Sequence, residues 1–498
     1  MRASSETGKW SAIALLILSA ICFASLSVYL SGRRIMWSDE LLAWNLLTDP
    51  SWHHMIQSWS RGADSGGPLF YLLARPLLLI TGPHPLTVRL FSAFCLWLAA
   101  VLWWGTLRQT FSGSSALIAV FLIWLCNGDF VDHLAEVRFY GLFVLAATVS
   151  FSAVIWIEEK QPSDRIIFLV CFLTNAFLIS AHMLGLIYSA VIVVALFFAT
   201  LPPRRRLAAI GGAFAGWLIL LAYLPAIRAG AGNLTWILLP GIRDLLRFYL
   251  HSPTVNRYVD GSLLLFVTAS LMLCLMWSRN LLAMPRGRRM LLVLCLLLFL
   301  IPAGFYVVSH IYKPIFAGRY MMPFELGFAG MVAGSLWLLE RRYPASRSVL
   351  LAGLLCLICG LHILNVREQS VRPLSDISSL TTLNSPLPIV IADADVFLKV
   401  LHYGNPSSTF IFPLPDDPQA RKQYMSLLIS IAEQGYAPGM MPDSELFARH
   451  RKFMLADLPS ENYFYSRSVL NNSQWTVHDT GVVQVNGETA HMLLIEHR

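Results

Sequence analysis

Charged side chains are scarce in this chain. Of its 498 residues only 13% are Asp, Glu, Lys or Arg, whereas 56% are hydrophobic, and the mean hydropathy is +0.60. A soluble protein of this size needs far more charge to cover its surface. The composition therefore excludes an ordinary soluble globular protein and predicts a polytopic α-helical membrane protein.

Residue clusters that would bind a metal are also lacking. The His, Cys, Asp and Glu residues show no metal-ligand spacing, so we expect no tightly bound metal and no other cofactor. All eight cysteines lie in apolar segments, and the polar C-terminal region has none, which argues against a disulfide framework. Cys356 and Cys359, one helical turn apart, are expected to be packing residues.

Internal repeats and low-complexity tracts are absent from the sequence, which disfavours a transporter built from inverted repeats. The formal net charge of +8 has the sign of a nucleic-acid-binding protein. However, the Arg clusters lie between apolar runs, where the positive-inside rule of membrane proteins accounts for them. We therefore expect no nucleic-acid partner.

Apolar runs predict about eleven transmembrane helices. The first, residues 10–30, is preceded by Arg2 and Lys9 and is predicted to be an uncleaved span with a cytoplasmic N-terminus, rather than a signal peptide. The other spans are predicted at residues 86–107, 116–127, 139–157, 166–181, 183–201, 207–227, 262–277, 290–309, 321–339 and 349–365.

A further apolar run, residues 68–81, is short for a span and contains Arg75 and Pro76. If this run does not cross the membrane, the basic loops all face the cytoplasm, as the positive-inside rule requires. Those loops are Arg108 and residues 158–165, 204–206, 279–289 and 341–347. We therefore predict that residues 68–81 are re-entrant or interfacial. The C-terminus and the polar segments 31–67, 129–138, 182, 228–260 and 310–320 then lie outside.

The composition divides the chain into two domains. Residues 1–366 are predicted to form the transmembrane domain, including the outer loop 31–67, and residues 367–498 a small extracytoplasmic α/β domain. A buried strand at 388–393 is followed by an N-capping Asp and a helix from about Val396. Further strands are predicted at 409–412 and 453–456. Asn486-Gly487 predicts a hairpin turn within residues 482–496.

An adjacent pair of carboxylates, Asp39 and Glu40, lies in the Trp-rich outer loop, in the stretch MWSDELLAW. Carboxylates at a membrane edge are unfavourable and are often functional. Neighbouring residues cannot share one helix face, so one is expected to point into a cavity and the other to cap or pair locally. The pair either supplies a general base or is the N-cap of an interfacial helix; the residues alone leave both open.

Two outer segments carry cations suited to phosphate. Arg138 directly precedes a span, at the depth of a lipid phosphate, and a guanidinium binds two phosphate oxygens together. Lys313, Arg319 and Tyr320 lie in SHIYKPIFAGRYMMP, against the positive-inside rule. The alternatives are a solvated loop whose charges neutralise one another for the first segment, and lipid-headgroup contacts by long side chains for the second.

Six motifs together resemble those of the GT-C membrane glycosyltransferases, in particular bacterial relatives of protein O-mannosyltransferases and of the lipid A aminoarabinose transferase. The first is the acidic pair of the first outer loop. GGPLFY at 66–71 resembles HPPLYY, and RLFSAF at 89–94 resembles RLPSAL. AEVRFYGL at 135–142, AHM at 181–183 and GRYMMP at 318–323 resemble EARPYAL, THY and PRYLLP. The order and spacing agree over nearly the whole chain, although several motif residues differ, among them the His-Pro of HPPLYY.

The resemblance implies an inverting glycosyltransferase that uses a polyprenyl-phosphate sugar as donor. Asp39 would be the catalytic base, with Glu40 beside it. Donor-phosphate binding would fall to Arg138, Arg319, Tyr320 and Lys313. Substrate contacts are predicted for Asp64, Tyr71, Tyr140 and His182, although a lone His between two apolar segments is more often a satisfied helix-end residue. The expected location is the bacterial inner membrane, and the sugar and acceptor are left open.

A transporter or flippase of a lipid-linked sugar is the main alternative, and a non-catalytic membrane scaffold is the second. Transporters usually place ionisable residues near the bilayer midplane, on broken helices. Here the ionisable residues gather at the outer ends of the predicted spans, which favours the enzyme.

Overall fold

The chain folds into two compact units in the computed structural model, which describes residues 3–229, 237–251, 284–371, 377–419, 426–458, 469–471, 473–485 and 488–498. Unit one comprises Met1–Gly32, Gly66–Tyr223 and Ile237–Ser370. Unit two comprises Arg33–Ser65, Leu224–Trp236 and Val371–Arg498.

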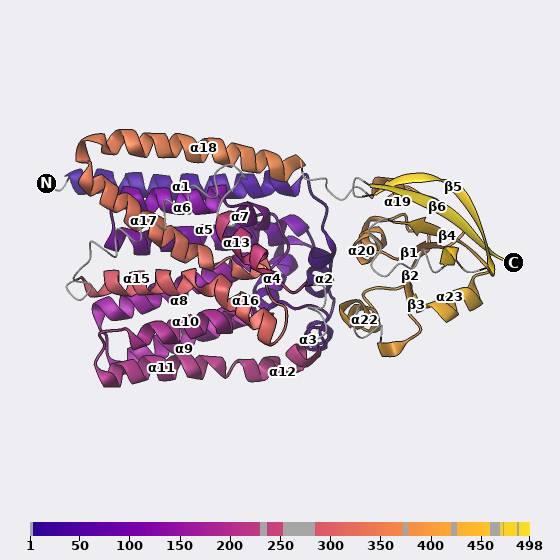
Figure 1. Ribbon diagram of the computed structural model, residues 1–498, viewed down its shortest axis with the longest axis horizontal. Coiled ribbons are helices and arrows are strands. Elements are labelled where there is room, and N and C mark those ends of the chain that lie inside the picture. Colours follow the sequence, from indigo (N-terminus) through magenta and orange to yellow (C-terminus); the bar gives the residue numbers. More distant parts are fainter. Residues whose placement is uncertain are drawn as a thin grey trace. The chain divides into compact units, whose positions relative to one another are not determined.

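Unit one is a bundle of apolar helices that run roughly parallel to one another (Figure 1). Its long helices are α1 (Ala3–Ser31), α5 (Pro85–Thr110), α6 (Gly113–Cys126), α8 (Tyr140–Lys160), α9 (Asp164–Ala181), α10 (Gly185–Phe197), α11 (Pro203–Trp217), α15 (Arg286–Phe299), α16 (Ile301–Ile311), α17 (Phe324–Arg342) and α18 (Arg347–Val371). Helix α12 (Leu220–Ala229) begins in unit one and continues into unit two after Tyr223. Shorter elements are α4 (Pro68–Thr81), α7 (Gly128–His133), α13 (Ile242–His251) and the 3-10 helices η3 (Gly318–Met321) and η4 (Pro344–Ser346).

Local sequence signals set several helix ends. Pro85 occupies the first turn of α5, where its missing N–H is not needed. The Ser112 hydroxyl caps α6 by accepting from the backbone N–H of Ser115. Gln161, in the left-handed conformation with φ of 49°, ends α8.

The predicted spans coincide with helices or broken helix pairs, except 262–277, which lies outside the described residues. Within the part of the chain that the structure describes, four helical stretches are long and apolar enough to cross a membrane: Pro85–Thr110, Tyr140–Lys160, Asp164–Ala181 and Arg286–Ile311. The bent pair of α11 and α12 would add a fifth. The figure of about eleven spans therefore stays a prediction.

The basic loops meet at one end of unit one. Arg205, in the first turn of α11, lies 3.5 Å from Asp164 of α9, and Arg289 of α15 lies 3.4 Å from Glu158 of α8. Arg288 donates to the carbonyl of Thr110 at the end of α5 over 2.8 Å. The loops that we predicted to share one membrane face are thus close in space.

Helix α4 starts and ends at the other end of unit one. Gly67, just before α4, packs on the backbone of Ala181, the last residue of α9. At its other end, the Thr81 hydroxyl lies 3.0 Å from that of Thr87 in the first turn of α5. Both α9 and α5 have their opposite ends among the basic loops, so α4 does not run the length of the bundle. A re-entrant or interfacial segment has this geometry.

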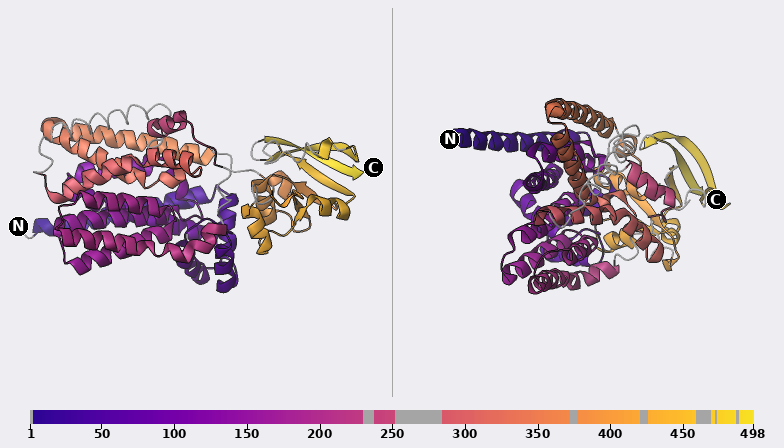
Figure 2. Two further views of the ribbon diagram at one scale, coloured as in Figure 1. Left: turned by 60° about the horizontal axis from the view of Figure 1, so that its bottom comes forward. Right: turned by 60° about the vertical axis from the view of Figure 1, so that its left-hand side comes forward.

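Unit two is built on a β-sheet (Figure 2). The sheet has six strands in the order β3-β2-β1-β4-β6-β5. Its strands are β1 (Ile389–Ile391), β2 (Phe410–Leu414), β3 (Met440–Pro442), β4 (Lys452–Asp457), β5 (Trp475–Val485) and β6 (Glu488–His497). Strands β3, β2, β1 and β4 are parallel, and β6 runs antiparallel to β4 and β5. Its helices include α19 (Ser378–Thr381), α20 (Ala394–Tyr403), α22 (Ser426–Glu433) and α23 (Asp443–Arg449).

The predicted α/β pattern of the C-terminal chain agrees with these elements. Asp393 is the N-cap of α20, and its carboxylate accepts from the backbone N–H of Val396 over 2.9 Å. The predicted hairpin is formed by β5 and β6, although its turn residues Asn486 and Gly487 lie outside the described residues. The short strand β3 was not predicted, because it has three residues and ends in Pro442, which only an edge strand tolerates.

The first outer loop packs with the C-terminal chain. It forms α2 (Ser38–Leu47) and α3 (Trp52–Ser60), and α2 packs against α20. The Ser430 hydroxyl donates to the carbonyl of Arg61 over 2.8 Å. We predicted this loop within the transmembrane domain, whereas its contacts group it with the C-terminal chain in unit two.

A buried carboxylate, Asp49, strengthens this packing. It accepts hydrogen bonds from the Tyr436 hydroxyl, from the ring of His54 and, over 2.7 Å, from the backbone N–H of Ser51. Burial raises the pKa of Asp49, but the hydrogen bonds from Tyr436, Ser51 and His54 outweigh it and leave the pKa below its ordinary value of 3.8.

Unit two should therefore lose stability in acid. Because the folded pKa of Asp49 lies below the unfolded one, its stabilisation is complete above the unfolded pKa and is lost as the pH falls through the folded pKa. Tyr436→Phe should lower the free energy of unfolding at pH 7 by about 1–3 kcal/mol and reduce this acid dependence. Thermal unfolding between pH 7 and 3 measures both, with Tyr343→Phe, an exposed Tyr of unit one, as control. An unchanged Tyr436→Phe protein would contradict the assignment.

Candidate functional site

An aromatic cluster surrounds His182, at the end of unit one away from the basic loops. The His182 ring centre lies 4.8 Å from that of Phe139, 5.0 Å from that of Phe143 and 5.7 Å from that of Tyr320. The Tyr140 ring is stacked on it at 6.2 Å. Residues 139–143, 182 and 320, far apart in sequence, therefore form one wall.

The two predicted phosphate-binding arginines flank this wall. The guanidinium carbon of Arg138 lies 4.7 Å from the ring centre of Phe139 and 5.9 Å from that of Tyr140. That of Arg319 lies 5.7 Å from the ring of Tyr320. Arg138 is only 3% exposed, whereas Arg319 is partly exposed. The structure thus brings together Arg138, Tyr140, His182, Arg319 and Tyr320, which we predicted from separate motifs.

The RLFSAF segment holds the backbone at Arg138. Ser92 donates its hydroxyl hydrogen to the carbonyl of Arg138 over 3.0 Å. Gly141 packs so closely on this turn of α5 that a Cβ atom there would lie 2.5 Å from the Ser92 carbonyl oxygen. Two of the motifs therefore meet through their small residues, which sequence spacing alone did not reveal.

Acidic groups lie beside both arginine segments. The Asn127 side chain donates to Glu325 over 3.0 Å and joins the start of α7 to the start of α17. A carboxylate oxygen of Asp129 is 3.3 Å from the position of a Cβ on Gly318, next to Arg319. His133 lies 3.4 Å from Glu136. Charges of both signs therefore surround the cluster.

His182 has a structural role as the residue that ends α9. Its Nδ1 accepts from the backbone N–H of Leu184 over 3.0 Å, so Nδ1 carries no proton. The side chain is 2% exposed. These contacts agree with the interpretation of His182 as a hydrogen-bonded helix-end residue. Its role in substrate binding stays a prediction.

This chain has Gly66-Gly67 where the motif that it resembles has His-Pro. Close packing at Gly67 explains the glycine at that position. A Cβ atom on Gly67 would lie 2.2 Å from the carbonyl oxygen of Ser180 and 2.5 Å from that of Ala181. Backbone meets backbone here, next to His182, so a side chain does not fit.

Gly67→Ala should destabilise unit one by about 1–3 kcal/mol, because α4 or the end of α9 must move to admit the methyl group. Thermal unfolding in detergent measures the loss. Gly105→Ala is the matched control, since a Cβ at Gly105 in α5 meets nothing within 4 Å. Equal stability of the two variants would refute the close packing.

Two further predicted residues also belong to unit one. Tyr71 is buried, and its ring centre is 5.5 Å from that of Phe70, which in turn lies 6.4 Å from that of Phe139. Lys313 lies in the segment between α16 and η3, and partial burial lowers its pKa. Tyr71 thus contacts the aromatic wall through the ring of Phe70.

The predicted acidic residues Asp39, Glu40 and Asp64 belong to unit two. Glu40 is 2% exposed, and its carboxylate accepts from the backbone N–H of Trp37 over 3.4 Å, at the start of α2. Asp39 is partly exposed and Asp64 is buried. As expected of neighbouring carboxylates, one caps the helix locally, and that one is Glu40.

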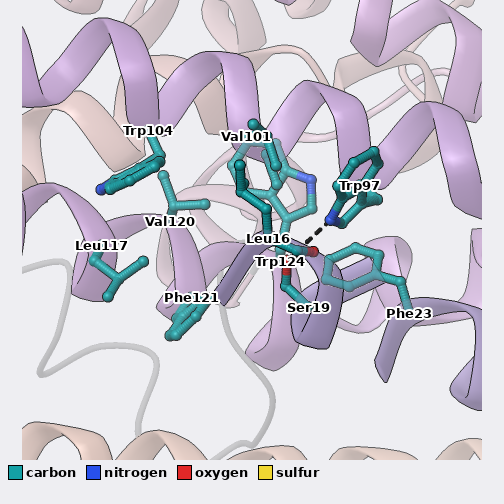
Figure 3. Close-up of a pocket in the computed structure, with 11 residues that line it drawn as sticks. Leu16, Ser19, Phe23, Trp97, Val101, Trp104, Leu117, Val120, Phe121 and Trp124 are labelled. Atoms are coloured by element: carbon teal, nitrogen blue, oxygen red, sulfur yellow. Dashed lines mark hydrogen bonds between the residues drawn. The ribbon is translucent and has the colours of Figure 1, made fainter. Parts of the chain in front are cut away.

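An apolar pocket lies elsewhere in unit one, between α1, α5 and α6 (Figure 3). Its walls include Phe23, Trp97, Trp104 and Trp124, and the indole N–H of Trp97 donates to the Ser19 hydroxyl over 3.0 Å. None of its lining residues was predicted to bind substrate.

Among the described residues, no three or more His, Cys, Asp or Glu side chains are arranged to hold a metal ion. The expectation that the protein binds no metal tightly stays a prediction.

Comparisons with known proteins rest on structure alone. No family model and no curated protein sequence matches this chain. Among solved structures, ArnT from Cupriavidus metallidurans without ligand is 13% identical with a TM-score of 0.59, and ArnT bound to undecaprenyl phosphate is 12% identical with a TM-score of 0.56. Both alignments cover 97% of this chain and 98% of the other.

An archaeal enzyme is similar as well. The Archaeoglobus fulgidus oligosaccharyltransferase, solved with zinc and sulfate, is 12% identical with a TM-score of 0.52, over 95% of this chain and 72% of that protein. ArnT, the lipid A aminoarabinose transferase, and this oligosaccharyltransferase are both GT-C enzymes. The fold of this chain, over nearly its whole length, is therefore that of the GT-C membrane glycosyltransferases.

Proposed function

We propose that this protein is an inverting glycosyltransferase of the bacterial inner membrane. It transfers a sugar from a polyprenyl-phosphate donor to an acceptor on the extracytoplasmic face. The observation that carries the proposal is the pair Arg138 and Arg319 on one aromatic wall, at the opposite end of unit one from the basic loops. The likeness in fold to ArnT, which binds undecaprenyl phosphate in one of its structures, supports the same donor class.

In the proposed reaction, Asp39 takes the proton from the acceptor nucleophile. The nucleophile attacks the anomeric carbon from the side opposite the phosphate, so the configuration inverts. The bond between the anomeric carbon and the phosphate oxygen breaks, and its electron pair leaves with the polyprenyl monophosphate.

The arginines act on the leaving group. Negative charge grows on the phosphate oxygen during bond breaking, and fixed cations in a water-poor site stabilise such charge most. Arg138 is buried and therefore pre-positioned, whereas Arg319 is more accessible. Two guanidinium groups supply several donors to a monophosphate without a metal ion.

The aromatic wall suits the remaining part of a lipid-linked sugar. The buried rings of Phe139, Tyr140 and Tyr320 place apolar groups next to charged ones, as is needed where a sugar, a phosphate and a hydrocarbon chain meet. Tyr71 and Lys313 are proposed to support substrate binding in unit one, and Asp64 in unit two.

Transfer by isolated membranes tests the proposal. Membranes that contain the protein should convert a radiolabelled polyprenyl-phosphate sugar into a glycosylated product, and membranes with Arg138→Ala should not. A flippase, the alternative function, would instead move the lipid-linked sugar across sealed vesicles without forming product. Movement of the donor with no product in either membrane would overturn the proposal.

A further inference from the structure

At the start of α2, Glu40 accepts from the backbone N–H of Trp37, which leaves the first N–H groups of the helix itself. Its N-cap residue is Trp37, whose indole can donate a hydrogen bond but cannot accept one. The first N–H groups of a helix have no partner within the helix, so acceptors must come from elsewhere. This matters because Asp39 is the second residue of α2.

Helix α20 of the C-terminal chain supplies one of these acceptors and also holds the chain just before the N-cap residue. A carboxylate oxygen of Asp395 accepts from the backbone N–H of Ser38 over 3.0 Å. The hydroxyl oxygen of Tyr403 accepts from the backbone N–H of Met36, also over 3.0 Å. Both contacts lie within three residues of Asp39, and both are within unit two.

Asp395 is itself held in place. Its second carboxylate oxygen pairs with the ammonium group of Lys399, one turn further along α20, and the Lys399 side chain is only 2% exposed. Asp393 caps the same turn of α20. One carboxylate oxygen of Asp395 thus contacts Lys399 of α20 and the other accepts from Ser38 of α2. Helix α20 therefore fixes where α2 begins.

We propose that Asp395 is a positioning residue for the catalytic base, and that the C-terminal domain fixes the start of α2 for catalysis. The inference rests on the proposed role of Asp39. The carboxylate of Asp395 anchors the backbone N–H next to Asp39, and Tyr403 anchors a second N–H two residues earlier. A reactive group misplaced by about 1 Å can lose 100-fold in rate, so a loosened α2 impairs catalysis.

The first test is hydrogen exchange of the full-length protein. In Asp395→Ala, the amides of Met36 to Asp39 should exchange faster than in the wild type. Asp416→Ala is the matched control, because Asp416 accepts from Ser444 within the C-terminal chain. It should leave exchange at these amides unchanged. Unchanged exchange in Asp395→Ala would overturn the proposed anchor.

Kinetics separate positioning from general instability. Asp395→Ala should lower kcat about 10- to 100-fold and leave the KM for the donor within about twofold, because the donor phosphate is assigned to unit one. Asp395→Asn keeps one side-chain oxygen that can accept from Ser38 but loses the pairing with Lys399, so it should recover part of kcat. A wild-type kcat together with faster exchange would overturn the positioning role.

A third variant keeps the test valid if Asp395→Ala does not fold. Tyr403→Phe removes the acceptor for Met36 and should also lower kcat. A Tyr403→Phe kcat equal to that of the wild type would then count against positioning. Failure of the underlying function is distinguishable, because Asp39→Asn would then be fully active. In that case the exchange difference at α2 would persist without a kinetic effect.

Discussion

Asp39→Asn should reduce kcat by about 100- to 10,000-fold, the range that a general base contributes. The substitution keeps the size of the side chain but removes its ability to take a proton from the acceptor. Donor binding should be unchanged, because the amide replaces a group assigned to the acceptor. Single-turnover transfer in detergent, with the donor in excess and membrane insertion verified, measures the effect.

Glu40→Gln is the matched control for this variant. Glu40 is the neighbouring carboxylate, and its contact with the backbone N–H of Trp37 needs only an oxygen acceptor, which Gln retains. Its kcat should stay within a few-fold of the wild type. If Glu40→Gln is inactive and Asp39→Asn is active, the assignment of the two carboxylates is reversed. Full activity in both variants would show that neither carboxylate is the general base.

Much of the fold follows from the sequence because membrane helices and buried strands leave strong local patterns. The apolar runs located the helices of unit one, and the strand before Asp393 with its capping carboxylate located β1 and α20. The positive-inside bias grouped the basic loops, and contacts such as that of Arg289 with Glu158 bring them together. Each of these signals is contained within a short segment or in a count of charges.

The packing of the outer loop left no such signal. The contact of Ser38 with Asp395 joins residues separated by 357 positions, and that of Asp49 with Tyr436 joins residues 387 positions apart. Neither pair belongs to a motif with fixed spacing. One hint was present: Trp37 cannot cap α2, so a partner from elsewhere was required. The sequence does not say which of the many acidic residues provides it.

The candidate site was only partly predictable for the same reason. Motif order identified Arg138, Tyr140, His182 and Arg319 as members of one site, and the aromatic wall joins them. The supporting contacts depend on close backbone approach, as at Gly67, where the sequence shows only a missing motif residue. Such approach is a property of tertiary packing and becomes visible only in the structure.

Arg138→Ala should weaken binding of a polyprenyl phosphate by about 100-fold or more, since a buried cation next to a phosphate has no solvent to replace it. Arg138→Lys should recover little, because an ammonium group cannot bind two oxygens in the fixed geometry of a guanidinium. Titration of the purified protein with undecaprenyl phosphate in detergent measures the dissociation constant. Arg205→Ala, at the opposite end of unit one, is the control and should bind normally.

Whether the two arginines bind one phosphate is decided by combining them. If Arg138 and Arg319 contact the same group, the double variant Arg138→Ala/Arg319→Ala should lose less binding energy than the sum of the single variants, because residues that share a partner are coupled. Arg138 should have the larger single effect, since it is buried at 3% exposure whereas Arg319 is partly exposed. Strict additivity would show that the two arginines contact different groups. Normal binding in both single variants would show that this wall does not bind the phosphate.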